Sequence, residues 1–191
     1  MTTSKSPGDF RSMSADEIVD NLALQIYEPP FLALREDLRS VPEALRIPIL
    51  LIDLDTELSM NGILGFLENS TGRYLADTIA ALEMIAAYAT AAVLLTIERI
   101  MADHGVTHER LRADNARMQE WQITTFAESH GEELSQMAKA IGREAERLYL
   151  YDRIHGREGE PVFDLLSAYI EQCKNELVTS LEACLANRAS G

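Results

Sequence analysis

The sequence predicts an all-α protein, a single domain built as a bundle of about seven to nine helices. Apolar residues recur at the three- and four-residue spacing of amphipathic helices almost throughout the chain. No stretch shows the alternating β-branched pattern, bounded by turn residues, that marks a β-hairpin. The chain has 191 residues, of which 47% are hydrophobic, and this suits one folded domain. We expect a flexible polar tail over residues 1–14 and the helical domain over 15–188.

Capping residues and prolines divide the first part of the chain into helices. Ser14 is followed three residues later by Glu17, which is the spacing of a capping box, so the first helix is expected to begin there. A proline pair at 29–30 ends this helix, and a short helix is expected over 31–39. Pro42 suits the first turn of a further helix, where its missing N–H costs no hydrogen bond.

The middle of the chain carries the longest apolar stretch. A helical segment over 56–68 is expected to break at the turn residues 69–72 and to resume over 74–101. That stretch is expected to bend near 86–89 and to end at Gly105. Its longest uncharged run would measure roughly 21 Å as a helix, which is too short for a hydrocarbon core of about 30 Å. It is therefore predicted to be buried within the protein.

Three further segments complete the bundle. Thr107 can cap a polar, arginine-rich segment over 107–122. A helix is expected over 132–154, ended by the histidine and glycine at 155–156. A last helix over 161–187 opens with a proline.

The last helix is the most clearly amphipathic element. Its apolar residues fall in one sector of a helical wheel, and this sector includes Cys173 and Cys184. The two cysteines would lie roughly 16 Å apart along the helix, beyond the reach of a disulfide, so we expect two buried and unpaired thiols. The opposite face carries the acidic residues Asp164, Glu171 and Glu182.

The chain is strongly acidic, with 31 Asp and Glu against 17 Lys and Arg and a formal net charge of −14. Direct binding to nucleic acid is disfavoured, because phosphate contacts need clustered Lys and Arg. The polar first residues lack the apolar core of a secretory signal, and unpaired thiols suit a reducing compartment, so we expect a cytoplasmic protein. The charge is concentrated: residues 47–98 hold seven acidic side chains against one basic, and residues 158–182 hold six against one.

Motifs for catalysis or cofactor binding are absent from the sequence. It contains no phosphate-binding glycine loop, dinucleotide fingerprint, zinc-protease helix or nucleophile elbow. His104 and His108 could face one metal only on an unbroken helix, and Gly105 argues against that. His130 and His155 each precede a glycine and are interpreted as solvated helix ends. We expect no metal, no cofactor and no enzymatic activity; a catalytic site assembled only by the fold is the remaining alternative.

The block over 59–94 combines Asn-Gly and aromatic positions with a helix of small residues. Its positions are Asn61-Gly62, Phe66, Asn69-Ser70, Gly72, Ala81-Leu82 and Ile85. This pattern resembles the family of the DNA mimic protein 19 domain, an all-helical bacterial domain. The segments 149–152 and 169–170 are also similar to that family's last helices. The chain departs from the family at Ile63 and Leu64, where a glycine and an aromatic are usual, and at Ala86, where glycine is frequent.

The motif is interpreted first as structural. Asn69 and Gly72 suit a helix-ending turn that needs a positive φ and side-chain hydrogen bonds to freed backbone groups. Phe66 is expected to anchor the core, and Asn61, beside Gly62, can bridge backbone groups in the same corner.

The resemblance also implies a function. The family's best-known member is a dimer that presents carboxylates like DNA phosphates and occupies the DNA-binding face of a transcription factor. By this resemblance we expect a basic, DNA-binding protein as partner and a homodimer; the short apolar run predicts no contact with membranes. The alternative is a structural, adaptor or immunity-type domain in which the charge serves solubility. The candidate partner-binding carboxylates are Asp53, Asp55, Glu57, Glu68, Asp77 and Glu83, together with Asp164, Glu171 and Glu182 of the last helix.

Overall fold

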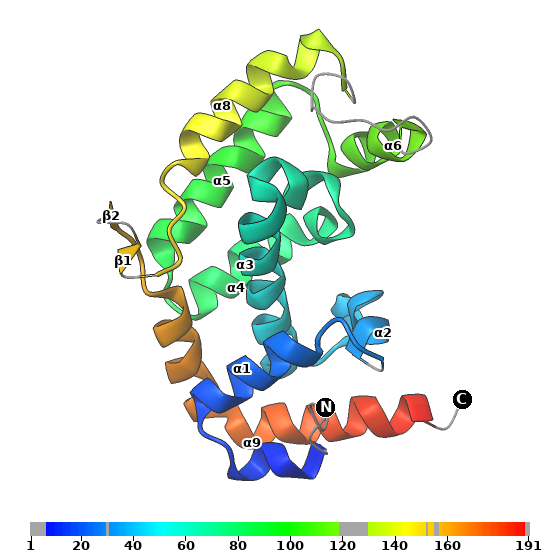
Figure 1. Ribbon diagram of the computed structural model, residues 1–191, viewed down its shortest axis with the longest axis vertical. Coiled ribbons are helices and arrows are strands. Elements are labelled where there is room, and N and C mark those ends of the chain that lie inside the picture. The colour runs from blue at the N-terminus through cyan, green and yellow to red at the C-terminus, as the bar shows by residue number, and fades with distance from the viewer. Residues whose placement is uncertain (1–6, 30, 119–129, 152, 155–156, 190–191) are drawn as a thin grey trace. The chain divides into compact units, whose positions relative to one another are not determined.

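The computed structural model describes residues 7–29, 31–118, 130–151, 153–154 and 157–189. Within them the fold is all-α, as the sequence predicts: eight α-helices are joined by short 3-10 helices and one pair of two-residue strands (Figure 1). The chain groups into two compact units. We call Met1–Ile52 with Phe163–Gly191 the terminal unit, and Asp53–Val162 the central unit.

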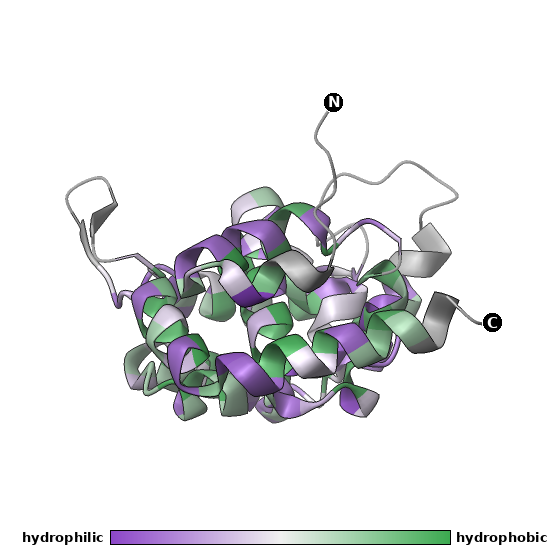
Figure 2. Ribbon diagram, turned by 90° about the horizontal axis from the view of Figure 1, so that it is seen from below, coloured by the Kyte–Doolittle hydropathy of each residue, from purple (hydrophilic) through white to green (hydrophobic). Residues whose placement is uncertain are grey.

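The terminal unit is built from helices that bury one side. Its elements are a 3-10 helix at Pro7–Ser12, α1 (Ala15–Gln25), α2 (Phe31–Arg35), a 3-10 turn at Leu38–Ser40, the first part of α3 (Glu43–Glu68) and nearly all of α9 (Val162–Ala189). Hydrophobic and hydrophilic residues alternate around the same helices, as amphipathic packing requires (Figure 2). The buried side chains of this unit include Phe10, Ile18, Leu22, Leu34, Leu45, Leu166 and Leu177.

The first ordered segment corrects the predicted tail. Pro7–Ser12 form a 3-10 helix, and Phe10 and Met13 are buried. Arg11 binds Glu182 of α9 at two points, with Nε 3.0 Å from Oε1 and Nη2 2.6 Å from Oε2. The expected flexible tail over 1–14 is therefore wrong from residue 7 onward, because two apolar side chains in a polar sequence are enough to pack this segment.

The predicted capping box of α1 is confirmed. The Glu17 backbone N–H donates to Ser14 Oγ at 3.3 Å, and the Ser14 N–H donates to a Glu17 carboxylate oxygen at 2.8 Å. A third free N–H of this helix end, that of Ala15, donates to Glu171 of α9 at 3.0 Å. The N-terminus of α1 is thus satisfied by two carboxylates, which its dipole favours.

The last helix begins where the proline predicts and buries its apolar side. Cys173 and Cys184 form no disulfide, as expected, but both are only half-buried rather than buried. Burial and the nearby Tyr169 hydroxyl act in opposite directions on the Cys173 thiol, and burial dominates, so its pKa is raised. Both thiols fall inside the apolar sector of a helical wheel, so the wheel alone does not separate buried from half-buried positions.

The central unit follows the end of α3. Its elements are a 3-10 helix at Ser70–Tyr74, α4 (Leu75–Met84), α5 (Tyr88–Asp103), α6 (His108–Met118), a 3-10 turn at Glu132–Leu134, α8 (Ser135–Ala145), and the strands β1 (Arg153–Ile154) and β2 (Arg157–Glu158). α5 packs against both α4 and α8. The bend predicted near 86–89 separates α4 from α5, and Gly105, with a φ of +62°, ends α5. Thr107 caps α6 through a 3.3 Å bond from the Arg110 N–H to its Oγ1.

Two predicted boundaries are wrong. α3 runs without interruption past Thr56 and changes direction only at Gly62, whose φ of +67° and ψ of −176° are not helical. The helix expected over 132–154 ends at Ala145, and the chain then becomes extended. Backbone N–H groups of Glu160 and Val162 donate to the carbonyls of Tyr149 and Leu150, each at 3.0 Å.

A short antiparallel hairpin replaces the end of that expected helix. β1 pairs with β2 in the register Arg153 opposite Glu158 and Ile154 opposite Arg157. Leu150 is buried and Tyr151 is 40% exposed, and residues 148–150 before the hairpin are not helical. The aromatic and β-branched residues of this segment favour an extended backbone. The predicted helix end at 155–156 lies outside the described residues.

The turn between α4 and α5 contains a strained residue. Ala86 has a φ of +63°, a left-handed conformation that is unfavourable for any residue with a Cβ. The turn closes α4 through hydrogen bonds from the Ala87 N–H to the Leu82 carbonyl at 2.8 Å and from the Ala86 N–H to the Glu83 carbonyl at 3.0 Å. Glycine is the usual residue at such a helix end.

We expect Ala86→Gly to stabilise the protein by about 0.5–1 kcal/mol, because relief of the left-handed strain exceeds the added flexibility of the unfolded chain. Ala92→Gly is the matched control. Ala92 is exposed inside α5, where glycine costs about 1 kcal/mol. Urea denaturation followed by circular dichroism measures both; destabilisation by Ala86→Gly would contradict the assigned backbone conformation.

Candidate partner-binding surfaces

The Asn-Gly motif forms a corner held by one carboxylate. Glu57 Oε2 accepts hydrogen bonds from Asn61 Nδ2 at 3.0 Å and from Asn69 Nδ2 at 2.7 Å. Asn61 therefore bridges to a side chain, and the expectation that it bridges backbone groups is wrong. Gly62 supplies the change of direction between the two asparagines. Glu57 is a structural acceptor in this corner as well as a candidate surface carboxylate.

Gly72 is required by close contact and not by a positive φ, which corrects the sequence interpretation. A Cβ at this position would lie 2.5 Å from the Leu67 carbonyl oxygen and 2.9 Å from His108 Nδ1. His108 Nδ1 also donates to the same Leu67 oxygen at 2.9 Å. Phe66, 1% exposed, anchors the corner in the core as predicted. The motif thus joins the end of α3, the following turn and the first residue of α6.

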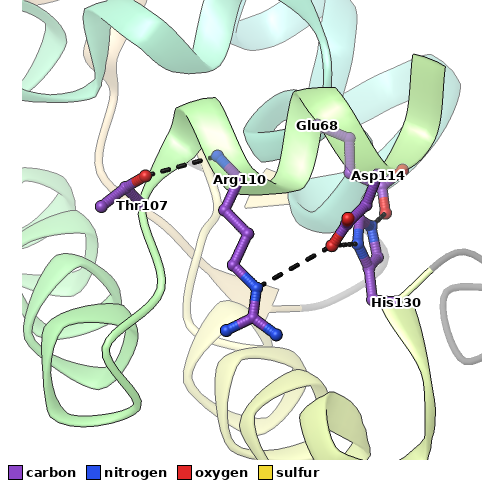
Figure 3. Close-up of polar contacts among 5 residues, drawn as sticks. All are labelled: Glu68, Thr107, Arg110, Asp114 and His130. Carbon is purple, nitrogen blue, oxygen red and sulfur yellow. Dashed lines mark hydrogen bonds and ion pairs between the residues drawn. The ribbon is translucent and has the colours of Figure 1, made fainter. Parts of the chain in front are cut away.

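The next contact in this region is a buried histidine between two acids (Figure 3). His130 Nε2 lies 2.8 Å from Glu68 Oε1, and His130 Nδ1 lies 3.2 Å from Asp114 Oδ2. The histidine side chain is 0% exposed, and those of Glu68 and Asp114 are 17% and 15% exposed. Each ring nitrogen lies within hydrogen-bonding distance of one carboxylate, so the ring bridges the two acids. Arg110 Nε lies 3.9 Å from Asp114 and adds a weaker attraction.

The contacts of His130 correct the sequence interpretation of this residue and bear on whether the cluster could hold a metal ion. His130 is not a solvated helix end; it links the last residue of α3 to α6. The two carboxylates lie at opposite edges of the ring and do not converge on a common point. No group of three or more His, Cys, Asp or Glu side chains in the described part of the chain could hold a metal ion. The contacts join residues 62 and 16 positions apart, so no local sequence pattern indicates them.

The nine candidate carboxylates differ widely in exposure. Asp53 is 3% exposed, which contradicts its place on a surface. The reason is that α3 is buried around nearly its whole circumference from Ile47 to Leu54, so a polar residue there has no solvent side. Five candidates are half-buried, namely Asp55, Glu57, Glu68, Asp77 and Glu182, and three are exposed, namely Glu83, Asp164 and Glu171.

Asp55 is also engaged within its own unit. The Tyr151 hydroxyl donates to Asp55 Oδ2 at 2.9 Å. Burial raises the pKa of Asp55, and the Tyr151 hydrogen bond opposes this only in part. Burial and the adjacent Asp55 charge raise the pKa of Tyr151 to about 12. The pair anchors the segment before β1, so Asp55 offers less charge to a partner than its sequence position indicates.

The terminal unit exposes acids that the sequence analysis did not select. Asp16 and Asp20 are exposed on α1, one helical turn apart. Glu171 of α9 reaches the N-terminus of the same helix through its bond to Ala15. We call Asp16, Asp20 and Glu171 the α1 acidic cluster. The capping-box pattern and the four-residue spacing could have indicated Asp16 and Asp20, but only tertiary packing adds Glu171.

The comparison with protein families identifies the relationship. The family model described as DMP19-like protein matches residues 39–173, more than half of the chain. The chain belongs to the DMP19-like protein family. The region shared with the DMP19-like family contains the whole central unit, including the corner around Gly72 and the His130 cluster. Searches of curated proteins and of solved structures gave no match. None of the described helices is long and apolar enough to cross a membrane.

Loss of the His130 ring should destabilise the protein. We expect His130→Ala to reduce the free energy of unfolding by about 2–4 kcal/mol, because two largely buried carboxylates lose their shared hydrogen-bond partner and the missing ring leaves a cavity. His104→Ala is the control, since His104 is exposed and should change stability by less than about 0.5 kcal/mol. Urea denaturation at neutral pH checks both; equal effects of the two variants would mean that His130 does not bridge the acids.

Substitution by alanine should change stability in opposite directions at Gly72, which is in close contact, and at Gly142, which faces open space. Gly72→Ala should destabilise by about 2 kcal/mol or more, because its Cβ would overlap backbone oxygens that cannot move independently. Gly142→Ala in α8 should stabilise by about 0.5–1 kcal/mol, since its Cβ would meet nothing within 4 Å and alanine favours helix. Thermal unfolding of the two variants measures this; tolerance of Gly72→Ala would contradict the close contact with Leu67.

Proposed function

We propose that the chain is a non-enzymatic protein-binding domain whose carboxylates occupy the DNA-binding surface of a basic, DNA-binding protein. Membership of the DMP19-like family is the observation that carries this proposal. A net charge of −14 supports it, because a strongly acidic surface attracts a cationic groove and competes with its DNA ligand.

The exposed acids supply the contact in this proposal. In the terminal unit they include the α1 acidic cluster and Asp164, and in the central unit they include Glu83. Within the described part of the chain, the carboxylates of Asp164 and Glu83 make no hydrogen bond or ion pair, so their charge is available to a partner. A carboxylate that makes no contact in the fold gives up no hydrogen bond or ion pair when it binds a basic protein. A carboxylate already engaged in the fold must give up such a contact.

An adaptor function is the second candidate, and one observation favours it. Leu24, Tyr27 and Leu32 of the terminal unit are 76%, 40% and 46% exposed. These residues lie within nine positions of one another in the sequence, and exposed apolar side chains that form a patch mark contact sites for other proteins. In this alternative the acidic residues maintain solubility, and the partner binds without giving up its own ligand.

The first experiment is to capture the partner from the native cell, identify it by mass spectrometry and purify it. We expect its affinity for this chain to fall steeply with added salt, and DNA carrying its binding site to compete with the chain. The triple variant Asp16→Asn, Asp20→Asn, Glu171→Gln should weaken binding by about tenfold or more, because each amide keeps the shape of the acid and removes its charge.

A charge-matched variant provides the control. Asp103→Asn, Glu109→Gln, Glu132→Gln removes the same number of exposed charges from the central unit. Equal weakening by both triple variants would indicate net charge rather than a defined surface. If the partner binds its DNA and this chain at the same time, the DNA-mimic function is wrong and the adaptor function replaces it.

A further inference from the structure

The turn between α4 and α5 exposes two large side chains that the acidic surface does not explain. Met84, the last residue of α4, is 54% exposed, and Tyr88, the first residue of α5, is 65% exposed. Of the residues between them, Ile85 is 5% exposed and Ala87 is fully buried, whereas Ala86 is exposed at the tip of the turn. The chain therefore places two unpartnered apolar groups on solvent within five positions. Methionine and tyrosine are enriched at the centres of protein interfaces.

Buried side chains and the carboxylate of Glu160 hold the turn that carries Met84 and Tyr88. Ile85 and Ala87 hold it in the core below. The Glu160 carboxylate accepts hydrogen bonds from the Ala89 N–H at 3.1 Å and the Thr90 N–H at 2.7 Å, which fills the N-terminus of α5. Ala86 keeps its strained left-handed conformation at the tip. Strain held by surrounding structure is common at binding sites, and a rigid turn loses little entropy when a partner binds.

The negative charge around this turn indicates which kind of partner it can bind. Residues 74–98 contain three acidic residues and no Lys or Arg. One of the acids, Glu83, is exposed directly beside Met84. Glu83 and Tyr88 are both exposed and lie five positions apart across the turn, and a guanidinium can stack on a tyrosine ring and pair with a carboxylate. An anionic membrane would be repelled by the same charges.

We propose that Met84 and Tyr88 anchor a docking surface for an arginine-bearing segment of another protein, with Glu83 pairing its guanidinium groups. This inference rests on the proposed function, because it takes the partner to be a basic protein. It adds an apolar contact, made by Met84 and Tyr88, that holds the partner. A second copy of the chain fits less well. Two identical turns meeting face to face would bring Glu83 against Glu83 with no cation from either turn to offset the repulsion.

The test uses three synthetic amphipathic peptides with the same leucines and with Arg, Lys or Gln at the polar positions. We expect the affinity of the full chain, measured by fluorescence anisotropy, to fall in the order Arg, Lys, Gln. Tyr88→Ala should weaken binding of the arginine peptide by about fivefold, while Tyr88→Phe, which keeps the ring, should not. Met84→Ala should also weaken it, and the methyl NMR signal of Met84 should shift on binding.

Met60→Ala is the matched control, because Met60 is 75% exposed and lies on α3, outside the turn. It should leave the peptide affinity unchanged. If the arginine peptide binds equally well to Tyr88→Ala and Met84→Ala but weakly to the α1 acidic-cluster variant, the docking surface is wrong and the proposed function stands. Absence of any binding to the arginine peptide also overturns the inference. Self-association that Met84→Ala abolishes would assign the surface to a second copy instead.

Discussion

The Leu67 carbonyl is the point on which the central unit depends. Gly72 approaches it so closely that a Cβ would lie 2.5 Å away, and His108 donates to it at 2.9 Å. This one oxygen therefore sets how the chain leaves α3 and where α6 begins. Glu68, the next residue, then reaches His130 and through it Asp114 further along α6. A small change at this corner would move α6 and His130 together, because they share these contacts.

Carboxylates have two separate uses in this protein. Glu57 binds two asparagines, Glu68 binds a buried histidine, and Glu160 caps the N-terminus of α5. These groups gain fixed hydrogen bonds from the fold and contribute less free charge to an approaching partner. A net charge of −14 therefore overstates the number of acids that can act as phosphate equivalents. Exposed acids such as Asp16 and Glu83 remain available for that purpose.

The acidic surface and the exposed apolar turn are complementary rather than competing features. Charge acts over roughly 8–10 Å at physiological salt, so it steers a basic partner before contact. Apolar groups act only in contact, where Met84 and Tyr88 on a rigid turn exclude water and slow dissociation. A surface that used charge alone would bind many cationic proteins, and a few buried anchors restrict the choice.

The sequence by itself determined the helical class, the capping box at Ser14, the bend near Ala86, the end of α5 at Gly105 and the start of α9. These features depend on the periodicity, capping and conformational limits of neighbouring residues, which a sequence displays directly. Tertiary structure alone decided the burial of Asp53, the bridging of His130 and the close contact of Gly72. It also decided the extended chain after α8, where backbone pairing with a later segment overrode a helical pattern. Each of these depends on groups distant in sequence, whose approach no local pattern encodes.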